Sequence, residues 1–291
     1  MRSFENLFSI TSYFHGNIYE ETASEIFHSI LNCFKENLQN KKNLTKGLST
    51  KDFLCKKVLT LPPKTNDWSR IVVSQARNET NNNLLIIKYI DFGKYDLLER
   101  NKLSVLMNIL SPQAHEFLRR KRQIGYLANA SLSDVRNRLG VCIIVNSSEK
   151  NLEEISQEME NFVIYFLDDY LETHLMESEY NQIVNGLIAE KLEIIRDMKL
   201  NCGRFWGEII LNELLFDRSQ KNVEILKKLG FKEMKTWIRE KMSNNKNSFI
   251  LGVVPKDAKF PKENELWELL KDKRQEYFKT FEMDLFHYEF Y

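Results

Sequence analysis

Apolar residues in this chain change their spacing along the sequence, and this change most constrains what the chain can fold into. The runs 70–76 and 84–90 are rich in Ile and Val, which predicts β-strands, and 53–59, 124–131, 141–146 and 249–254 are similar. Elsewhere the apolar residues recur every three or four positions, which predicts amphipathic helices. Because the two periods alternate, we expect an α+β fold with helices packed on a mixed, largely antiparallel sheet.

The expected helices share apolar residues at helical spacing, and they cover 23–34, 95–110, 111–122, 151–170, 177–197, 204–215, 222–229, 232–242 and 263–279. A short strand at 10–14 precedes the first of them. Ser111-Pro112 is typical of a helix start, and Asn151 with Glu154 three residues later is typical of a capped one. No linker is biased enough in composition to divide the chain. We therefore expect one domain over 1–291, with a core at about 8–254 and a helical tail at 255–291.

Composition excludes several classes of partner and compartment. The 42 basic and 41 acidic residues leave a net charge of +1, so no general field favours nucleic acid or an anionic membrane. The 4 cysteines, Cys33, Cys55, Cys142 and Cys202, lie far apart and predict reduced thiols. No apolar run approaches the roughly 20 residues that span a bilayer, and no secretory signal is evident. We expect a cytoplasmic protein.

Motifs for cofactor, metal or nucleophile chemistry do not occur in the sequence. No His-x-x-Glu-His, Gly-rich phosphate loop or nucleophile elbow is present. The segment His174-Leu175-Met176-Glu177-Ser178 is like a zinc motif in which Ser replaces the second His, and neutral Ser is a poor ligand. We expect no metal or cofactor on this chain. His15 is expected to form hydrogen bonds in its turn.

Several separated blocks resemble the final domain of the pitrilysin/insulinase family of zinc metallopeptidases. They are His15-Gly16-Asn17; Arg77-Asn78-Glu79 with Asn81 and Asn82; Leu118-Arg119 with Gln123-Ile124-Gly125-Tyr126; and Phe205-Trp206-Gly207-Glu208-Ile209-Ile210 with Phe216-Asp217-Arg218. They occur in the order of the family. The resemblance implies the non-zinc, C-terminal part of an insulin-degrading-enzyme-like peptidase.

In that family, zinc lies in an N-terminal half, and an Arg and a Tyr of the last domain reach the bound peptide from the opposite wall. The resemblance therefore implies that Arg119 and Tyr126 contact peptide substrates in trans, with a zinc-bearing N-terminal half as partner. Zinc would belong to that partner, and this chain would be inactive alone. The run Arg120-Lys121-Arg122 departs from the family, which usually has an acid in this stretch. Substrate preference is expected to differ accordingly.

Plainer interpretations stand beside these. Arg119 would be an ordinary surface arginine, Tyr126 a half-buried strand tyrosine, and the run Arg119 to Arg122 a nucleic-acid patch. Phe205 and Trp206 are expected to be core anchors, and Gly125 to spare space where backbone approaches closely. The alternative function is a catalytically inactive relic, or a regulatory protein of the same fold that binds peptides or partners. Whether the chain is itself an enzyme is left open.

Overall fold

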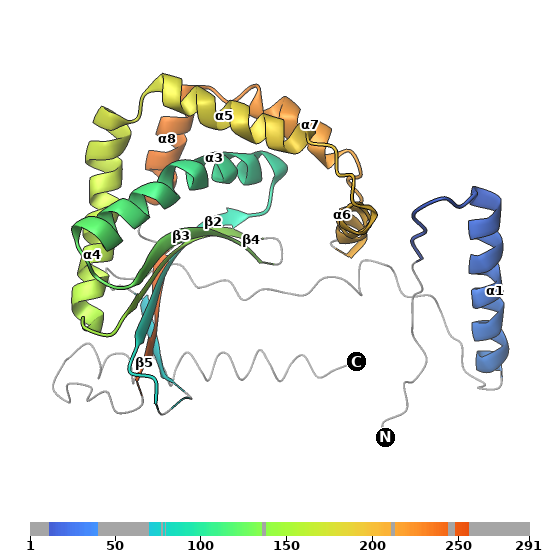
Figure 1. Ribbon diagram of the computed structural model, residues 1–291, viewed down its shortest axis with the longest axis horizontal. Coiled ribbons are helices and arrows are strands. Elements are labelled where there is room, and N and C mark those ends of the chain that lie inside the picture. Colours follow the sequence, from blue (N-terminus) through green and yellow to red (C-terminus); the bar gives the residue numbers. More distant parts are fainter. Residues whose placement is uncertain are drawn as a thin grey trace. The chain divides into compact units, whose positions relative to one another are not determined.

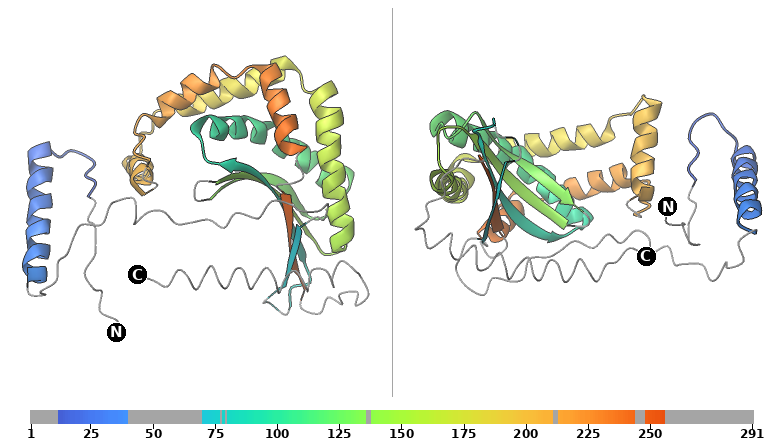
Figure 2. Two further views of the ribbon diagram at one scale, coloured as in Figure 1. Left: turned by 180° about the vertical axis from the view of Figure 1, so that it is seen from behind. Right: turned by 90° about the horizontal axis from the view of Figure 1, so that it is seen from below.

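The computed structural model describes residues 12–39, 70–76, 78, 80–135, 138–210, 213–243 and 248–255. Figure 1 shows its ribbon, and Figure 2 shows it from two further sides. The strand expected at 53–59, the helix expected at 263–279 and the block residues Arg77 and Glu79 lie outside the described residues. Within the described part, no helix is both long and apolar enough to cross a membrane.

The described elements alternate between helix and strand. In chain order they are α1 (Glu20–Gln39), β1 (Arg70–Gln75), β2 (Leu84–Lys94), α3 (Leu97–Ala114), η1 (His115–Lys121), β3 (Leu127–Val135), β4 (Arg138–Ser147), α4 (Leu152–Tyr165), η2 (Phe166–His174), α5 (Glu177–Leu192), α6 (Met198–Ile210), α7 (Arg218–Leu226), α8 (Phe231–Met242) and β5 (Ser248–Val254). The segments η1 and η2 are π-helices that continue α3 and α4 without a break.

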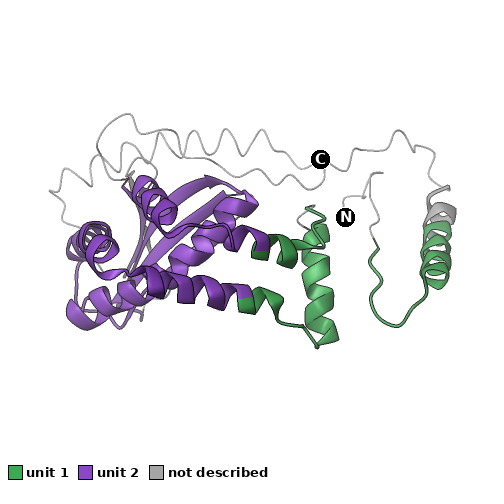
Figure 3. Cartoon of the chain, turned by 90° about the horizontal axis from the view of Figure 1, so that it is seen from above, with its two compact units in different colours: residues 1–58, 189–223 green, residues 59–188, 224–291 purple. Residues whose placement is uncertain are grey.

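Two compact units divide the chain, and Figure 3 colours them separately. Unit 1 comprises Met1–Val58 and Ala189–Val223, and unit 2 comprises Leu59–Ile188 and Glu224–Tyr291. The division passes through α5 and α7 rather than between elements. It does not test the expected single domain over 1–291, which stays a prediction.

Unit 2 is built on a 5-stranded sheet in the order β1-β5-β2-β4-β3. β2 pairs antiparallel with β4 and β5, and β3 pairs antiparallel with β4. Only the β1–β5 pair is parallel among the described strands. This arrangement confirms the predicted α+β class with a mixed, largely antiparallel sheet.

The two faces of the sheet have different environments because successive side chains of a strand alternate between faces. One face is buried beneath helices that include α3 and α4 (Figure 1), and it carries Ile86, Ile90, Val141, Ile143 and Val145. Each such side chain contributes roughly 1.5–3 kcal/mol when removed from water. On the opposite face the side chains are half-buried, and they include Leu85, Ile87, Tyr89, Ile144 and Phe249. The core of unit 2 therefore lies on the helical side of the sheet.

Helix α3 runs through Pro112, which corrects the prediction that Ser111-Pro112 begins a separate helix. Asp96 caps its start by accepting hydrogen bonds from the backbone N–H groups of Leu98 and Glu99. A proline inside a helix removes one backbone hydrogen bond and usually kinks or ends it. Here the residues on both sides of Pro112 are buried, and they include Ile109, Leu110, Ala114, Phe117 and Leu118. Packing of this continuous apolar face outweighs the local break.

Strands β3 and β4 are longer than the sequence predicted. Pairing continues to Val135 opposite Arg138, so the polar segment expected to join them belongs largely to the strands. At the other end, Ile124 and Tyr126 precede β3 instead of belonging to it. The expected cap of α4 is confirmed, because Asn151 and Glu154 form a capping box.

Helix boundaries in unit 1 differ from those expected. Residues 12–14, expected to be part of a strand, have no regular secondary structure, whereas α1 follows as a helix. Helix α6 begins at Met198 and ends at Ile210, so the helix expected over 204–215 is shifted toward the N-terminus. Leu214 has φ +52°, a left-handed conformation that an α-helix does not contain. That residue forms part of the turn before α7.

Candidate functional site

Arg119 is presented to solvent by the π-helix η1. Leu118 and Phe117 are buried and attach η1 to the core, while Arg119 is exposed. The Arg119 Nη1 atom lies 3.3 Å from His115 Nε2, one turn earlier in the chain. A guanidinium only donates, so the imidazole nitrogen is the acceptor in this contact. Among the described residues, no other hydrogen bond occupies the remaining N–H groups of this guanidinium, so a ligand could accept from them.

The neighbouring basic residues are engaged differently from Arg119. Arg120 forms an ion pair with Glu116 at 3.2 Å, and Arg122 lies 3.4 Å from Glu158. Lys121 lies over the Tyr165 ring, 5.4 Å from its centroid. Among the described residues, the contacts of Arg119 thus include no carboxylate, although it stands in the same basic run.

A tight turn follows η1 and holds the next residues close to strand β4. Gln123 has φ +52°, and Ile124 is buried, with 2% of its surface exposed. A Cβ atom on Gly125 would lie 2.2 Å from the backbone oxygen of Asn146. No side chain fits at that distance, so the prediction that Gly125 spares space for a close backbone approach is confirmed.

Tyr126 leaves this turn with its ring in solvent. It is 60% exposed, so the plainer interpretation of Tyr126 as a half-buried strand tyrosine is wrong. Its hydroxyl oxygen accepts a hydrogen bond from Asn146 Nδ2 at 2.9 Å. Asn146 belongs to β4, where it pairs with Leu127 of β3 and Leu85 of β2. The phenol is therefore tethered to the C-terminal end of β4, an inner strand of the sheet.

Arg119 precedes the turn at residues 123–125, and Tyr126 follows it. Both are exposed, and each touches one polar side chain of unit 2, His115 for the arginine and Asn146 for the tyrosine. No hydrogen bond joins the two residues to each other in the described part of the chain. The arrangement provides two solvent-exposed polar groups, each of which is held by a hydrogen bond at its polar end.

The half-buried sheet face beside Asn146 carries no reactive thiol. Burial raises the pKa of Cys142, and a hydrogen bond with Ser133 offsets part of that rise. Burial and the nearby Asp91 carboxylate raise the pKa of Tyr89 to about 12. A thiol with a raised pKa is protonated at neutral pH and is a poor nucleophile.

Zinc is the metal that the resemblance implies, and we tested whether side chains of this chain could hold it. No group of 3 or more His, Cys, Asp or Glu side chains with metal-binding geometry occurs among the described residues. His174 ends η2, Leu175 is extended with ψ 108°, and Glu177 begins α5. The zinc-like segment is therefore split between two helices, whereas ligands of a helical motif must share one face. The described residues do not fit a zinc site.

Unit 1 contains an aromatic cluster and a polar hollow. The Tyr13 hydroxyl lies 3.1 Å from His15 Nδ1, which confirms that His15 forms a hydrogen bond in its turn. Tyr13 also stacks on Trp206, with ring centroids 6.4 Å apart. Trp206 is 39% exposed and Phe205 is half-buried, so the expectation that they are core anchors is wrong.

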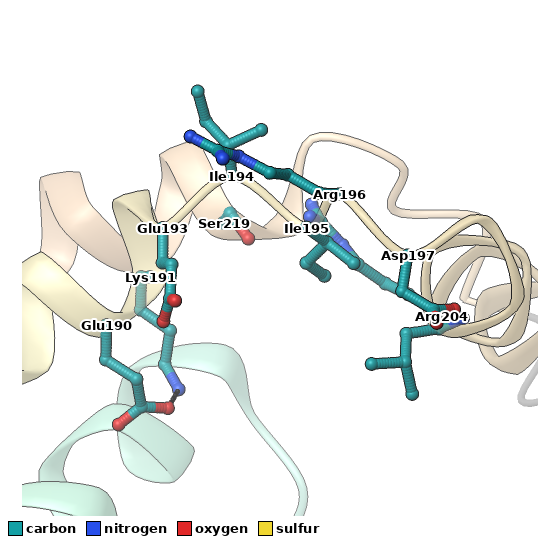
Figure 4. Close-up of a pocket in the computed structure, with 10 residues that line it drawn as sticks. Glu190, Lys191, Glu193, Ile194, Ile195, Arg196, Asp197, Arg204 and Ser219 are labelled. Atoms are coloured by element: carbon teal, nitrogen blue, oxygen red, sulfur yellow. Dashed lines mark hydrogen bonds and ion pairs between the residues drawn. The ribbon is translucent and has the colours of Figure 1, made fainter.

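The hollow of unit 1 has a volume of about 790 Å³ and lies where α5 ends and α6 begins. Figure 4 shows that its wall carries both signs of charge: Glu190, Glu193 and Asp197 against Lys191, Arg196 and Arg204. Lys191 and Glu190 form an ion pair at 2.7 Å. Balanced charges give no preference for an anion or a cation, so we assign no ligand to this hollow.

Glu208 and Arg218, which belong to the same sequence block, form an ion pair in the structure. Glu208 is the buried residue of α6, with 5% of its surface exposed, and its Oε2 accepts from Arg218 Nη2 at 2.7 Å. Arg218 also pairs with Glu213. The pair ties the start of α7 to α6 across the turn that contains Leu214. The sequence did not identify this role, although an acid and an arginine in one block were visible.

Comparisons with known proteins find similarities to this sequence. Residues 105–206 match the family model described as PQQ synthase PqqF-like, C-terminal lobe domain 4. Human insulin-degrading enzyme is 25% identical over 234 residues, which are 80% of this chain and 22% of that protein. Rat nardilysin is 26% identical over 169 residues, which are 57% of this chain and 14% of that protein. The chain thus spans about a fifth or less of the length of these curated relatives.

A solved structure shows the same fold. Pitrilysin has a TM-score of 0.65 at 15% identity, covering 86% of this chain and 24% of that one. At this identity the likeness concerns the fold alone. Both Arg119 and Tyr126 lie inside the segment that matches the C-terminal lobe domain.

Proposed function

We propose that this chain, which is similar to the C-terminal part of insulinase-family peptidases, forms one wall of a peptide-binding site that a zinc-bearing N-terminal half completes. Peptide hydrolysis would require both parts. The observation that carries the proposal is the solvent-facing pair of donors, Arg119 and Tyr126, fixed on either side of one turn.

The chemistry of the two side chains fits the main chain of a peptide. A guanidinium presents a planar fork of N–H donors, and a phenol can donate one hydrogen bond. Backbone carbonyl oxygens are the acceptors that any peptide offers, whatever its sequence. Donors of this kind also stabilise negative charge that develops on a carbonyl oxygen when it is attacked. In this proposal, Arg119 and Tyr126 bind and orient the peptide.

In this proposal the metal belongs to the other half, as the resemblance to the family implies. Zinc in such sites polarises a carbonyl and activates water. The donors proposed here would act on the same peptide from the opposite side. Such a division would make activity depend on both parts being present.

Peptide binding by the purified chain tests this role without the partner. The probe is fluorescein-labelled insulin, the polypeptide named in the human relative, and the readout is fluorescence anisotropy. Replacing Arg119→Ala removes charged hydrogen bonds and should weaken binding roughly 10- to 100-fold. Tyr126→Phe removes one neutral hydrogen bond and should weaken it roughly 2- to 10-fold.

Arg120→Ala is the matched control. It removes one positive charge from the same run, but Arg120 is already paired with Glu116. We expect binding within about twofold of the unmodified chain, since exposed ion pairs contribute little. Equal losses in Arg119→Ala and Arg120→Ala would mean that general electrostatic attraction, and not a specific contact, holds the peptide. That result would refute the proposed role of Arg119.

The alternative is a relic or regulatory domain of the same fold that binds peptides or another protein without taking part in hydrolysis. The two candidates differ in their partner. Affinity purification from the source cells should recover a protein with a His-x-x-Glu-His helix if the peptidase proposal is right. Recovery of a stable partner without that motif would favour the regulatory role.

Compartment and nucleic-acid binding are also open to test. The cytoplasmic location and the absence of a nucleic-acid partner both remain predictions from charge and sequence. Cell fractionation checks the first. For the second, binding to a labelled duplex should be weak, whereas a tight complex that weakens steeply with salt would contradict it.

A further inference from the structure

The hydroxyl of Tyr126 is engaged as an acceptor, and this leaves its proton free. Asn146 Nδ2 donates to the Tyr126 oxygen at 2.9 Å. A phenol has one O–H to donate and lone pairs that accept. Because the amide occupies a lone pair, the O–H is not needed for the contact with Asn146. Tyr126 is 60% exposed, so that O–H can point to solvent or to a ligand.

The backbone of Asn146 is held in place by its neighbours on both sides. It lies on β4, which is flanked by β2 and β3, and both neighbours pair with it directly. The missing side chain of Gly125 lets the turn approach the Asn146 carbonyl, where an added Cβ would lie 2.2 Å away. The turn that carries Tyr126 and the strand that carries Asn146 are thus in close contact.

The oxygen of the Asn146 side-chain amide lies in a position that is energetically unfavourable. Its Oδ1 atom is buried without a hydrogen-bond partner among the described residues. A buried acceptor left unpaired typically costs about 1–3 kcal/mol. Rotating the amide would bring Oδ1 to the phenol, which would then donate to it, but Nδ2 would then occupy the buried position without a partner among the described residues. The structure instead keeps the donor on Tyr126 and leaves the acceptor unpaired.

We propose that Asn146 is a positioning residue that keeps the Tyr126 hydroxyl turned outward as a donor to a backbone carbonyl oxygen of a bound peptide. This inference rests on the proposed function, because it needs Tyr126 to contact the peptide. It adds a direction to that contact: the tyrosine donates and the peptide accepts. Nothing in the sequence blocks pointed to Asn146.

The substitution Asn146→Asp keeps the shape of the side chain but reverses the direction of its hydrogen bond with Tyr126. A carboxylate only accepts, so the Tyr126 O–H turns toward it and is withdrawn from the peptide. We expect the affinity for fluorescein-labelled insulin to fall to that of Tyr126→Phe, roughly 2- to 10-fold. Asn146→Ala, which leaves the O–H free but no longer aimed, should give a smaller loss.

The double variant separates positioning from a merely structural role. If Asn146 acts through the phenol, Asn146→Asp has no further effect in a Tyr126→Phe background, so the two losses are not additive. Asn129→Asp is the matched control, because it adds the same charge on the same face of the neighbouring strand, where its Oδ1 is also buried without a partner among the described residues. No hydrogen bond joins Asn129 to Tyr126 among the described residues, so Asn129→Asp should show no dependence on the Tyr126 hydroxyl: its effect on affinity should be the same in the Tyr126 and Tyr126→Phe backgrounds.

Each result decides a different claim. Additive losses, or an Asn146→Asp variant that binds like the unmodified chain, would overturn the positioning role. If Asn146→Asp fails to fold, the Asn146→Ala comparison in both tyrosine backgrounds decides the same question. A Tyr126→Phe variant that binds normally would instead refute the proposed function itself. The two failures are therefore distinguishable.

Discussion

At the scale of single residues, the turn before β3 allows almost no change at Gly125. A side chain there would meet the Asn146 carbonyl oxygen at 2.2 Å and its carbon at 2.9 Å, both of them backbone atoms. Backbone cannot move aside as a flexible side chain can. We expect Gly125→Ala to lower the free energy of unfolding by roughly 1–3 kcal/mol through overpacking. Urea denaturation followed by circular dichroism measures this change.

Gly186→Ala is a matched control for that substitution. Gly186 is exposed within α5, and no atom lies within 4 Å of an added Cβ. Alanine there should stabilise the chain by roughly 0.5–1 kcal/mol because it favours the helix. If both substitutions had the same sign, the proposed close approach at Gly125 would be wrong.

A lysine inside the core provides a second prediction at this scale. Lys88 is 2% exposed on the helical side of β2, and Glu160 of α4 is its ion-pair partner. A buried charge without a partner is strongly destabilising. Glu160→Ala should therefore cost roughly 3 kcal/mol of unfolding free energy. Urea midpoints at neutral pH check it.

Lys88→Met supplies the comparison. Methionine has similar length and no charge, and replacing a buried pair by apolar residues is often neutral or stabilising. In a Lys88→Met background, Glu160→Ala should cost little, because no stranded charge remains. A cost that is the same in both backgrounds would show that Glu160 stabilises α4 by some other contact.

At the scale of elements, the cap of α4 has a defined energetic role. Asn151 accepts from the Glu154 N–H at 2.8 Å, and the Glu154 carboxylate accepts from the Asn151 N–H at 3.3 Å. Asn151→Ala should lower the unfolding free energy by about 1 kcal/mol, whereas Asn151→Asp keeps the acceptor and should change it little. Thermal unfolding of the two variants measures both. Equal losses would argue that the side-chain acceptor is not what stabilises the helix start.

The same elements show what the sequence could predict. The period of the apolar residues predicted the class of fold, and Asn151 with Glu154 marked a real helix start because capping depends on adjacent residues. The break expected at Pro112 was wrong, because the buried residues around it belong to contacts made far along the chain. Neither the π-helices η1 and η2 nor the parallel β1–β5 pair has a local pattern that would predict it.

The candidate site divides in the same way. Arg119, Tyr126 and Gly125 could be proposed from the sequence because they lie in one contiguous block that resembles a family motif. Asn146 was missed, since it meets Tyr126 only when β4 pairs beside the turn. Glu208 and Arg218 were included in a sequence block, but their ion pair could not be predicted because it depends on the turn between α6 and α7. Contacts between distant segments are what the sequence could not supply.

At the scale of the whole molecule, three tyrosines of unit 2 should make the free energy of unfolding depend on pH in the alkaline range. Burial is the first cause that raises the pKa of Tyr89, Tyr170 and Tyr180, each to about 12 from an ordinary value of 10.0. Nearby carboxylates raise it further, as Glu179 does for Tyr170. The three tyrosines belong to β2, η2 and α5, so their titration affects the sheet and two separate helices.

The sign of this coupling is fixed by the direction of the shifts. Between about pH 10 and 12 the folded chain keeps phenol protons that the unfolded chain has released, so stability is complete below about pH 10 and is lost as pH rises toward 12. Tyr180 donates its O–H to the Leu229 carbonyl at 3.0 Å, a bond that a phenolate cannot make. Tyr180→Phe should therefore be less stable than the unmodified chain at neutral pH, yet lose less stability between pH 9 and 11. Urea midpoints across this range measure the slope, and an unchanged slope in Tyr180→Phe would show that this phenol titrates alike in both states. The loss at high pH would then have to come from other groups.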